Sequence, residues 1–257
     1  MALNGRRTWK ITFVVLLFLF VVNVPMVLAS EAFKPLPQDL EIELALSALP
    51  PYLREEATVY SLNPDRGFEI VRKGNNGFHT FVARTSPDGY LGEWVPLDHY
   101  PDDLLIPIAF DSAGAKANMV PWFDVAKMQA EGVSPKEAKR ILKKNYETGV
   151  YKAPERAGIS YMLAPVLRSY CHPDEDNTQG TVNFPHYMFY APNVSNQDIG
   201  GGPPLGTAIW IFRPGPHGYM NLKMGEKEIA DINEEYKEMI ARLGKLKKEW
   251  RLPKKTK

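Results

Sequence analysis

The sequence predicts an α+β fold: a mainly antiparallel sheet with helices packed on one side, followed by a C-terminal amphipathic helix. Short apolar, aromatic-rich segments bounded by Pro and Gly indicate the central strands, because such runs are typical of strands covered on both faces. Near the C-terminus, apolar residues recur at spacings of three and four, which favours a helix. The central segments lie at residues 159–164, 186–191, 207–212 and 217–223.

The first 29 residues have the pattern of a secretory signal peptide. Three basic residues precede an apolar run at residues 11–22, and the small residues Val27 and Ala29 stand before Ser30, as cleavage requires. The apolar run has 12 residues, whereas a membrane span needs about 20. The sequence therefore predicts a secreted or periplasmic protein, and only an uncleaved leader would place it in a membrane.

Removal of the leader leaves 28 basic and 30 acidic residues, a net charge of −2. This balance argues against nucleic-acid binding, which needs a basic surface. The remaining length suits one domain with a buried core. We divide the chain into the signal peptide (1–29), an N-terminal tether and helix start (30–44), a single globular domain (45–223), and a C-terminal amphipathic helix with a basic tail (224–257).

The clearest turn signal is Asn76-Gly77, within a pair of strand-like runs spanning residues 68–84. Asn-Gly favours a two-residue hairpin turn, because both central residues of that turn take positive φ angles. The sequence therefore predicts a type I′ hairpin in which Arg72 lies opposite Phe81.

The remaining elements of the first two thirds follow from local signals. Ser134 and Glu137 form a capping box, with Pro135 at the first helical position, so a helix starts there. Prolines make residues 86–103 irregular. Strands are predicted at residues 58–62 and 104–110, and helices from Asp39 to Pro50, at residues 121–130, and from Pro135 to Gly149.

The C-terminal helix is predicted at about residues 226–250, with one apolar stripe of period 3.5. This period fits a short coiled-coil seam, which would join copies of the chain into a homo-oligomer. A surface helix that docks on its own domain shows much the same pattern, so both interpretations stay open. The stripe consists of Ile229, Ile232, Tyr236, Met239, Leu243, Leu246 and Trp250.

Three phrases resemble a family of uncharacterised exported bacterial proteins. They are RKGNNGF at residues 72–78, FDSAG at residues 110–114 and PHYMFYAPN at residues 185–193. The resemblance implies export and one domain, but no activity. Members of that family carry two cysteines where this chain has Thr80 and Ala109, and the joint absence would make sense if those cysteines pair across neighbouring strands.

A catalytic site is not specified by any strong motif. The sequence lacks the spacings of zinc sites and the serine-hydrolase elbow, so no metal or cofactor is predicted. The candidates for a hydrolase are His186 and His217, which open two central strands, and Asp174, which lies in an acidic loop. If the two strands pair antiparallel, their starts lie at opposite ends; if they are parallel or separated, the two histidine rings could meet. Residues 166–185 show no strand or helix pattern, and a loop of this length is usually functional or disordered.

Aromatic residues on the central strands offer an alternative to catalysis. Tyr187, Tyr190 and Tyr219 are the candidate ligand-binding residues, because their rings could stack on a sugar or another flat ligand. The sequence thus favours an exported module that binds a ligand or a protein of the cell envelope. A periplasmic hydrolase that uses histidine and carboxylate, and a structural oligomer joined through the C-terminal helix, are the alternatives.

Overall fold

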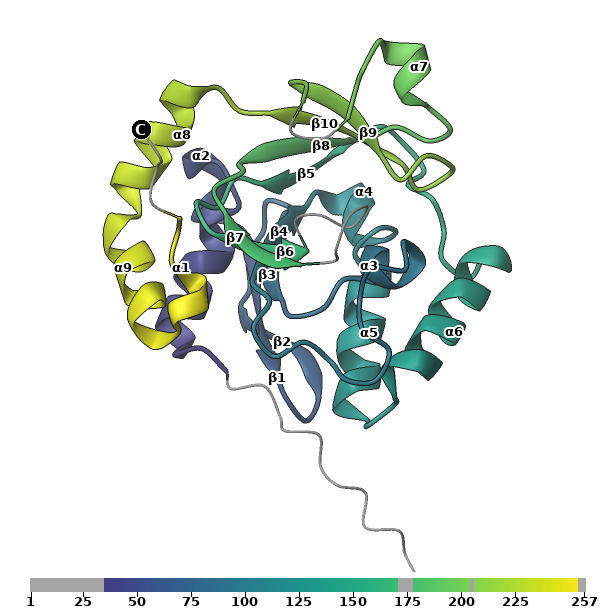
Figure 1. Cartoon of the computed structure of the whole chain (residues 1–257), viewed down its shortest axis with the longest axis horizontal. Coiled ribbons are helices and arrows are strands. Elements are labelled where there is room, and N and C mark those ends of the chain that lie inside the picture. Colours follow the sequence, from purple (N-terminus) through teal and green to yellow (C-terminus); the bar gives the residue numbers. More distant parts are fainter. Residues whose placement is uncertain (1–34, 171–177, 204–205, 254–257) are drawn as a thin grey trace, which may run out of the picture.

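The structure is a computed structural model, which describes residues 35–170, 178–203 and 206–253 (Figure 1). The predicted α+β class is confirmed, with a mainly antiparallel sheet of eight strands in the order β2-β1-β3-β4-β5-β8-β10-β9. The strands are β1 (Thr58–Asn63), β2 (Gly67–Arg72), β3 (His79–Ala83), β4 (Ile106–Phe110), β5 (Ile159–Met162), β8 (His186–Tyr190), β9 (Ile209–Phe212) and β10 (Tyr219–Lys223).

The predicted hairpin at residues 68–84 is wrong. The strand β2 pairs with β1, and β3 runs parallel to β1 on its other side, so Arg72 lies opposite Val59 and not opposite Phe81. Gly77 has a positive φ of 77°, but it is the only residue of the Asn-Gly pair that does. The Asn76 side chain instead donates to the Leu53 carbonyl and accepts from the Phe78 amide, so the loop crosses the end of β1.

Helices cover both faces of the sheet, whereas the sequence predicted one side. Leu40 of α1 (Gln38–Ser47) packs with Val82 of β3 on one face, and Trp122 of α5 (Val120–Ala130) packs with Phe81 on the other. Adjacent residues of a strand point to opposite faces, so we call these the α1 face and the α5 face. All five residues of β4 are buried, and a strand buried in this way needs cover on both sides.

Two further helices pack beside α5, and a small separate sheet lies next to β4. Helix α6 (Pro135–Glu147) starts where the capping box predicts, and α3 (Pro87–Leu91) occupies a segment that the sequence predicted to be irregular. Two strands, β6 (Leu167–Tyr170) and β7 (Gln179–Val182), form a hairpin within residues 166–185, where no strand was predicted. At four residues each, these strands are too short to give a clear alternation.

The C-terminal segment is two helices rather than one. Helix α8 (Glu226–Glu235) ends at Tyr236, where φ is −104° and ψ is 19°, and α9 (Lys237–Leu246) continues to the short turn η1 (Lys248–Trp250). Helix α9 packs against α1, and Leu243 is fully buried there. Leu246 is 52% exposed, because the predicted stripe leaves the contact with α1 before the helix ends.

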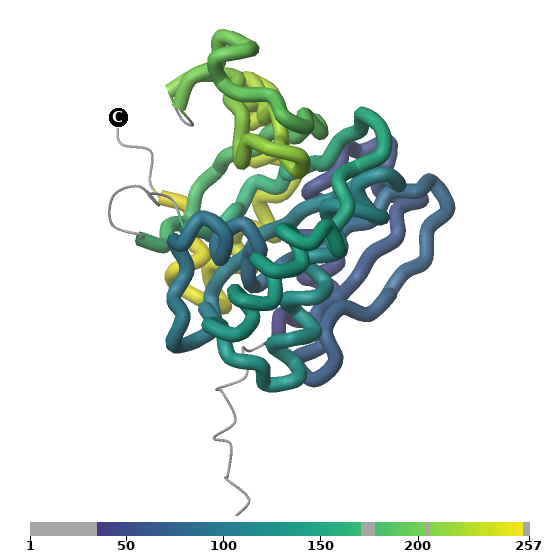
Figure 2. The backbone as a smooth tube through the Cα atoms, turned by 90° about the vertical axis from the view of Figure 1, so that its right-hand side faces the viewer, coloured from purple at the N-terminus to yellow at the C-terminus, as the bar shows by residue number. Residues whose placement is uncertain are grey.

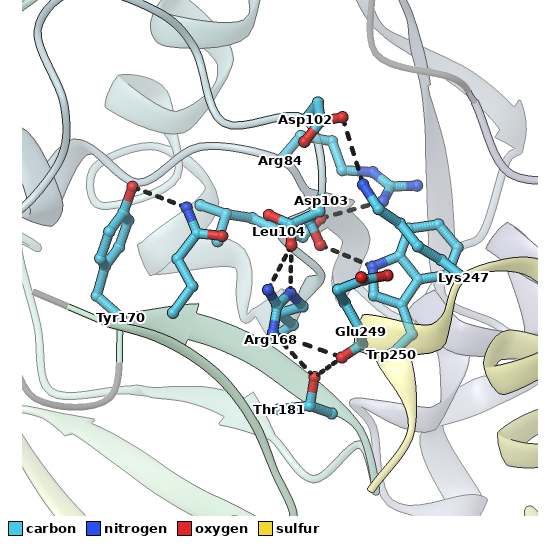
Figure 3. Close-up of polar contacts among 11 residues, drawn as sticks. Arg84, Asp102, Asp103, Leu104, Arg168, Tyr170, Thr181, Lys247, Glu249 and Trp250 are labelled. Carbon is cyan, nitrogen blue, oxygen red and sulfur yellow. Dashed lines mark hydrogen bonds and ion pairs between the residues drawn. The ribbon is translucent and has the colours of Figure 1, made fainter.

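A polar cluster joins the C-terminal turn to the core (Figure 3). Arg168 of β6 donates to the Asp103 carboxylate over 2.6 Å, and the Trp250 indole donates to the Asp103 carbonyl over 2.7 Å. The Thr181 hydroxyl of β7 donates to the Glu249 carbonyl. Since the ion pair is almost fully buried, removal of one partner would leave an uncompensated charge.

The remaining helices are single turns at the sheet margins: α2 (Pro51–Arg54), α4 (Ser112–Ala115) and α7 (Asn196–Ile199). The Asn196 side chain of α7 accepts from the Ile211 amide over 2.6 Å, which blocks part of the outer edge of β9. Such a cover limits pairing of an edge strand with other chains. No helix within residues 35–170, 178–203 and 206–253 has the length and apolar character to span a membrane.

Candidate functional site

The two candidate histidines lie at opposite ends of one strand pair. His186 opens β8 opposite Lys223, and His217 precedes β10 at the end where Tyr219 lies opposite Tyr190. Because β8 and β10 are antiparallel, the two imidazoles do not share a site. Asp174 lies outside the described residues.

His186 is buried among aromatic rings. Its Nδ1 donates to the Phe184 carbonyl over 2.8 Å, and its ring centroid lies 5.8 Å from that of Trp210. Burial lowers the pKa of His186 to about 4, because the charged form would lose its hydration. The neutral imidazole of His186 is therefore packed in the protein interior like other core side chains.

His217 belongs to a second, separate cluster. Its ring packs edge-on against Tyr146 at 4.9 Å, and the Arg213 guanidinium lies 4.9 Å from the same tyrosine ring. Arg213 is paired with the buried carboxylate of Asp88. Burial and the nearby charge of Arg213 lower the pKa of His217 to about 4. The cluster ties the β9–β10 turn to α3 and α6, and its charged groups are already paired with each other.

Tyr190 and Tyr219 point to the α5 face, where they are buried. The Tyr190 hydroxyl donates to Asp111 over 3.0 Å, and Asp111 also accepts from the amides of Ala113 and Gly114 at the start of α4. Burial raises the pKa of Tyr190 and of Tyr219. The FDSAG and PHYMFYAPN phrases are thus joined by the hydrogen bond between Tyr190 and Asp111. No spacing in the sequence predicted this contact.

Tyr187 points to the α1 face, away from Tyr190 and Tyr219. Its ring centroid lies 5.8 Å from that of Tyr161 on the neighbouring strand β5. The alternation of side chains along β8 separates the three candidate tyrosines. They do not form one ligand site, and only Tyr187 remains partly exposed.

The α1 face of strands β5, β8, β10 and β9 carries two apolar rows, which follow from the strand register. We call this surface the open face. Two residues of each strand point toward it, so it forms an array four strands wide. The first row is Ile159, Phe189, Met220 and Ile211, and the second row is Tyr161, Tyr187, Leu222 and Ile209.

The open face is apolar and only partly covered. Leu222 is 38% exposed, and five other members of the array are half-buried, while Tyr161 and Ile211 are buried. Helix α1 packs on β1, β3 and β4, at the other end of the sheet. Ala48 and Leu49, which follow α1, pack with Tyr161, and Leu53 of α2 and Ile232 of α8 join the same cluster, so the β5 end of the array is the covered end. Figure 2 shows the β9 and β10 region (yellow-green) at the top of the molecule, far from β1 and β2 (blue). At the margin, the Tyr52 side chain of α2 is 79% exposed.

The sequence did not predict the open face. Near-continuous apolar strands predict a sheet that is covered by other elements on both faces. The array itself contains no charged side chain, and the carboxylate of Glu228 lies near its rim. Glu228 of α8 lies close enough to Tyr187 to raise the pKa of that phenol, after the larger effects of burial and of Tyr52.

We next consider groups of possible metal ligands and hollows among the described residues. No group of three or more histidine, cysteine, aspartate or glutamate side chains there is arranged to hold a metal ion. Two hollows, of about 500 Å³ along α8 and about 300 Å³ along α9, lie outside the open face. The open face itself consists of side chains suited to apolar contact.

Comparisons with other proteins add no relative. The chain matches no family model, no curated protein and no solved structure. The functional argument therefore rests on the geometry of the open face.

Proposed function

We propose that the chain is an exported, non-catalytic binding domain that holds another protein chain of the cell envelope on its open face. The observation that carries this proposal is the partly exposed apolar array on half of one sheet face. The largest contiguous apolar patch on a monomeric protein is often functional, and protein contacts are one common use of such patches. Aromatic residues and methionine, which the array contains, are also enriched at protein interfaces.

The two alternative functions have less support. A hydrolase would need His186 and His217 in one accessible site, but the strands separate them, and the pKa of each imidazole is lowered to about 4, too low for an effective general base near neutral pH. An oligomer joined through the C-terminal helix would need a free apolar stripe, but Tyr236, Met239 and Leu243 are buried within the chain's own core.

Export is a prediction from the leader sequence, and the N-terminus of the protein isolated from its host tests it. N-terminal sequencing of the protein from its host should give Ser30 as the first residue. An intact Met1 in the membrane fraction would instead support an uncleaved anchor.

Site-specific cross-linking tests the open face. A photoreactive aromatic amino acid replaces Phe189 in the full chain, which is then illuminated in its host. A covalent adduct with one defined protein is expected, because the ring would lie at the contact. The matched control carries the same group at Ile70, a 57% exposed residue on the far edge strand β2. Absence of an adduct at position 189, or the same adducts from both positions, would contradict the proposal.

A further inference from the structure

The hollows along α8 and α9 lie on one flank of the C-terminal helices. Their lining residues recur at steps of three and four, which places them side by side along each helix. Figure 1 shows α8 and α9 (yellow) one after the other along one side of the molecule, so the two hollows follow in the same order. We call this flank the C-terminal groove. Its residues are Glu226, Ile229, Ala230, Asn233 and Glu234 on α8, and Ile240, Ala241 and Gly244 on α9.

The α8 part of the groove is open. The structure describes all ten residues of α8, and none of them is buried. The groove has a partly apolar floor, because Ile229 and Ala230 lie between Glu226 and Glu234. This part of the groove therefore offers both apolar contact and negative charge to an occupant.

The chain turns back along the groove after η1. The Arg251 side chain donates to the Gly244 carbonyl over 2.8 Å, and Leu252 lines the hollow of α9 together with Ile240 and Ala241. Leu252 also packs against the core cluster that α9 enters. The chain thus passes from the level of residue 244 toward that of residue 240, which is the direction of α8.

The next residues are long enough to reach α8. The five residues that follow Leu252 span about 17 Å when extended. Glu234 precedes Ile240 by six positions, or about 9 Å of helix, and Glu226 precedes it by 14 positions, or about 21 Å. A lysine at position 254 or 255 is therefore within reach of Glu234, and the long side chain of Lys257 is within reach of Glu226.

Charge favours the same path. Helix α8 has one lysine and five carboxylates, a net charge of 1 − 5 = −4, whereas residues 254–257 (KKTK) carry three positive charges. Among the described residues, Glu226 has no ion-pair partner, and Glu234 pairs with Lys237 in an exposed contact of 2.5 Å. Such exposed pairs are weak and exchange readily. The positive charge of Lys245, which lines the α9 hollow, repels other lysines and directs them toward α8.

We infer that residues 254–257 lie in the α8 part of the C-terminal groove, where their lysines pair with Glu226 and Glu234. This contact is separate from the proposed binding function and does not involve the open face. A segment of the same chain has an advantage over any separate basic partner, because a short link holds it at a millimolar effective concentration. The segment would hold α8 and α9 together across their boundary at Tyr236.

Zero-length cross-linking tests the contact in the protein as its host produces it. A carbodiimide joins a lysine amine to a carboxylate where the two groups touch, and mass spectrometry of the digested monomer identifies the pair. At about 10 mM salt, where charges act over about 30 Å, we expect links from residues 254–257 to Glu226 or Glu234. Glu147 is the matched control, because it is 62% exposed but lies on α6, on the other side of the molecule (Figure 1).

The links should be lost at about 0.5 M salt, where the charges are screened. Links of equal yield to Glu147, or none to the two carboxylates of α8, would overturn the inference. Links that form only between two copies would also overturn it, since the tail would then come from another chain.

The rate of tryptic cleavage after Lys254 gives a second test, because a docked segment is protected and a detached one is not. Combined Glu226→Gln and Glu234→Gln substitution should raise this rate about fivefold, the effect of losing two exposed ion pairs. Glu147→Gln should leave the rate unchanged. Circular dichroism checks that both variants are folded. Equal cleavage rates in the double variant and the unmodified chain would overturn the inference.

Discussion

Gly114 shows how a single residue can fix a junction between elements. It follows Asp111 at the start of α4, and its Cα faces the Tyr190 ring of β8 so closely that a methyl group there would overlap the phenol oxygen. Glycine is the residue that permits such an approach. The FDSAG phrase therefore has a structural explanation: Asp111 binds Tyr190, and Gly114 makes room for it.

Gly114→Ala should lower the free energy of unfolding by about 2–4 kcal/mol, because the buried Tyr190 ring cannot move away without loss of packing. Urea unfolding measures the change. Gly132→Ala is the control, since Gly132 has a φ of 74° but no atom near its missing side chain. That variant should lose only about 1 kcal/mol through backbone strain. Equal losses in the two variants would show that the contact with Tyr190 is not the cause.

His186 should make the protein sensitive to mild acid. Its pKa is about 4 when folded and about 6.5 when unfolded, so the unfolded chain binds a proton that the folded chain does not. Its contribution to stability is therefore complete above about pH 6.5 and decreases as the pH falls toward 4. At pH 5 the expected loss is about 2 kcal/mol relative to pH 7.5.

Urea unfolding at pH 7.5 and pH 5 measures this loss. His186→Gln should lose about 2 kcal/mol less between the two pH values than the unmodified chain. His99→Gln, in which a largely exposed side chain is replaced, should keep the full loss. If the His186 variant keeps the full loss as well, another group is responsible.

At the scale of elements, α9 offers a comparison within one helix. Leu243 and Leu246 belong to the same predicted stripe, yet Leu243 is fully buried against α1 and Leu246 is 52% exposed. Leu243→Ala should cost about 2–5 kcal/mol in the free energy of unfolding, because it leaves a cavity. Leu246→Ala should cost about 0.5 kcal/mol or less. Thermal or urea unfolding separates the two, and similar losses would mean that α9 does not dock as described.

The elements also show what the sequence could predict. Apolar runs located the central strands, and local capping placed the start of α6, because both signals depend on residues close together in the chain. The pairing of β2 depends on tertiary contacts instead. The Asn75 and Asn76 amides donate to the Glu56 carbonyl across the end of β1, so a strong hairpin signal becomes a crossing loop. The boundary between α8 and α9 at Tyr236 likewise has no Pro or Gly beside it that would predict the end of a helix.

At the scale of the whole molecule, both ends of the described chain enter one core. Leu36, at the start, and Trp250, near the end, belong to the same cluster, and Arg242 of α9 pairs with Asp39 of α1. Deletion of residues 226–257 should therefore destabilise the entire domain by more than 5 kcal/mol, since it removes several buried side chains at once.

Circular dichroism and light scattering test the deletion together. The shortened chain should lose the cooperative transition of the intact protein. If it stays folded with unchanged stability, the C-terminal helices are not part of the core. If the intact chain associates with itself and the shortened chain stays folded but does not, the C-terminal helices join the copies, as the coiled-coil interpretation predicts.

The candidate surface illustrates the limit of sequence reasoning at this scale. Each strand of the array has an apolar pattern that the sequence revealed, but the pattern alone does not tell which face lacks a helix. That depends on where α1 and α8 end relative to β8 and β10. The three candidate tyrosines separate for the same reason, because the face of each ring is fixed by the register of strands far apart in the sequence.

The contact between Trp250 and Asp103 has a consequence for folding during synthesis of the chain. A ribosome synthesises the chain from its N-terminus, so Asp103 is made long before α9 and Trp250. Until then, Leu36, Leu40 and Leu44 lack the partners that α9 supplies. A chain whose synthesis has not yet reached α9 should therefore lack part of this core and stay less compact than the complete domain.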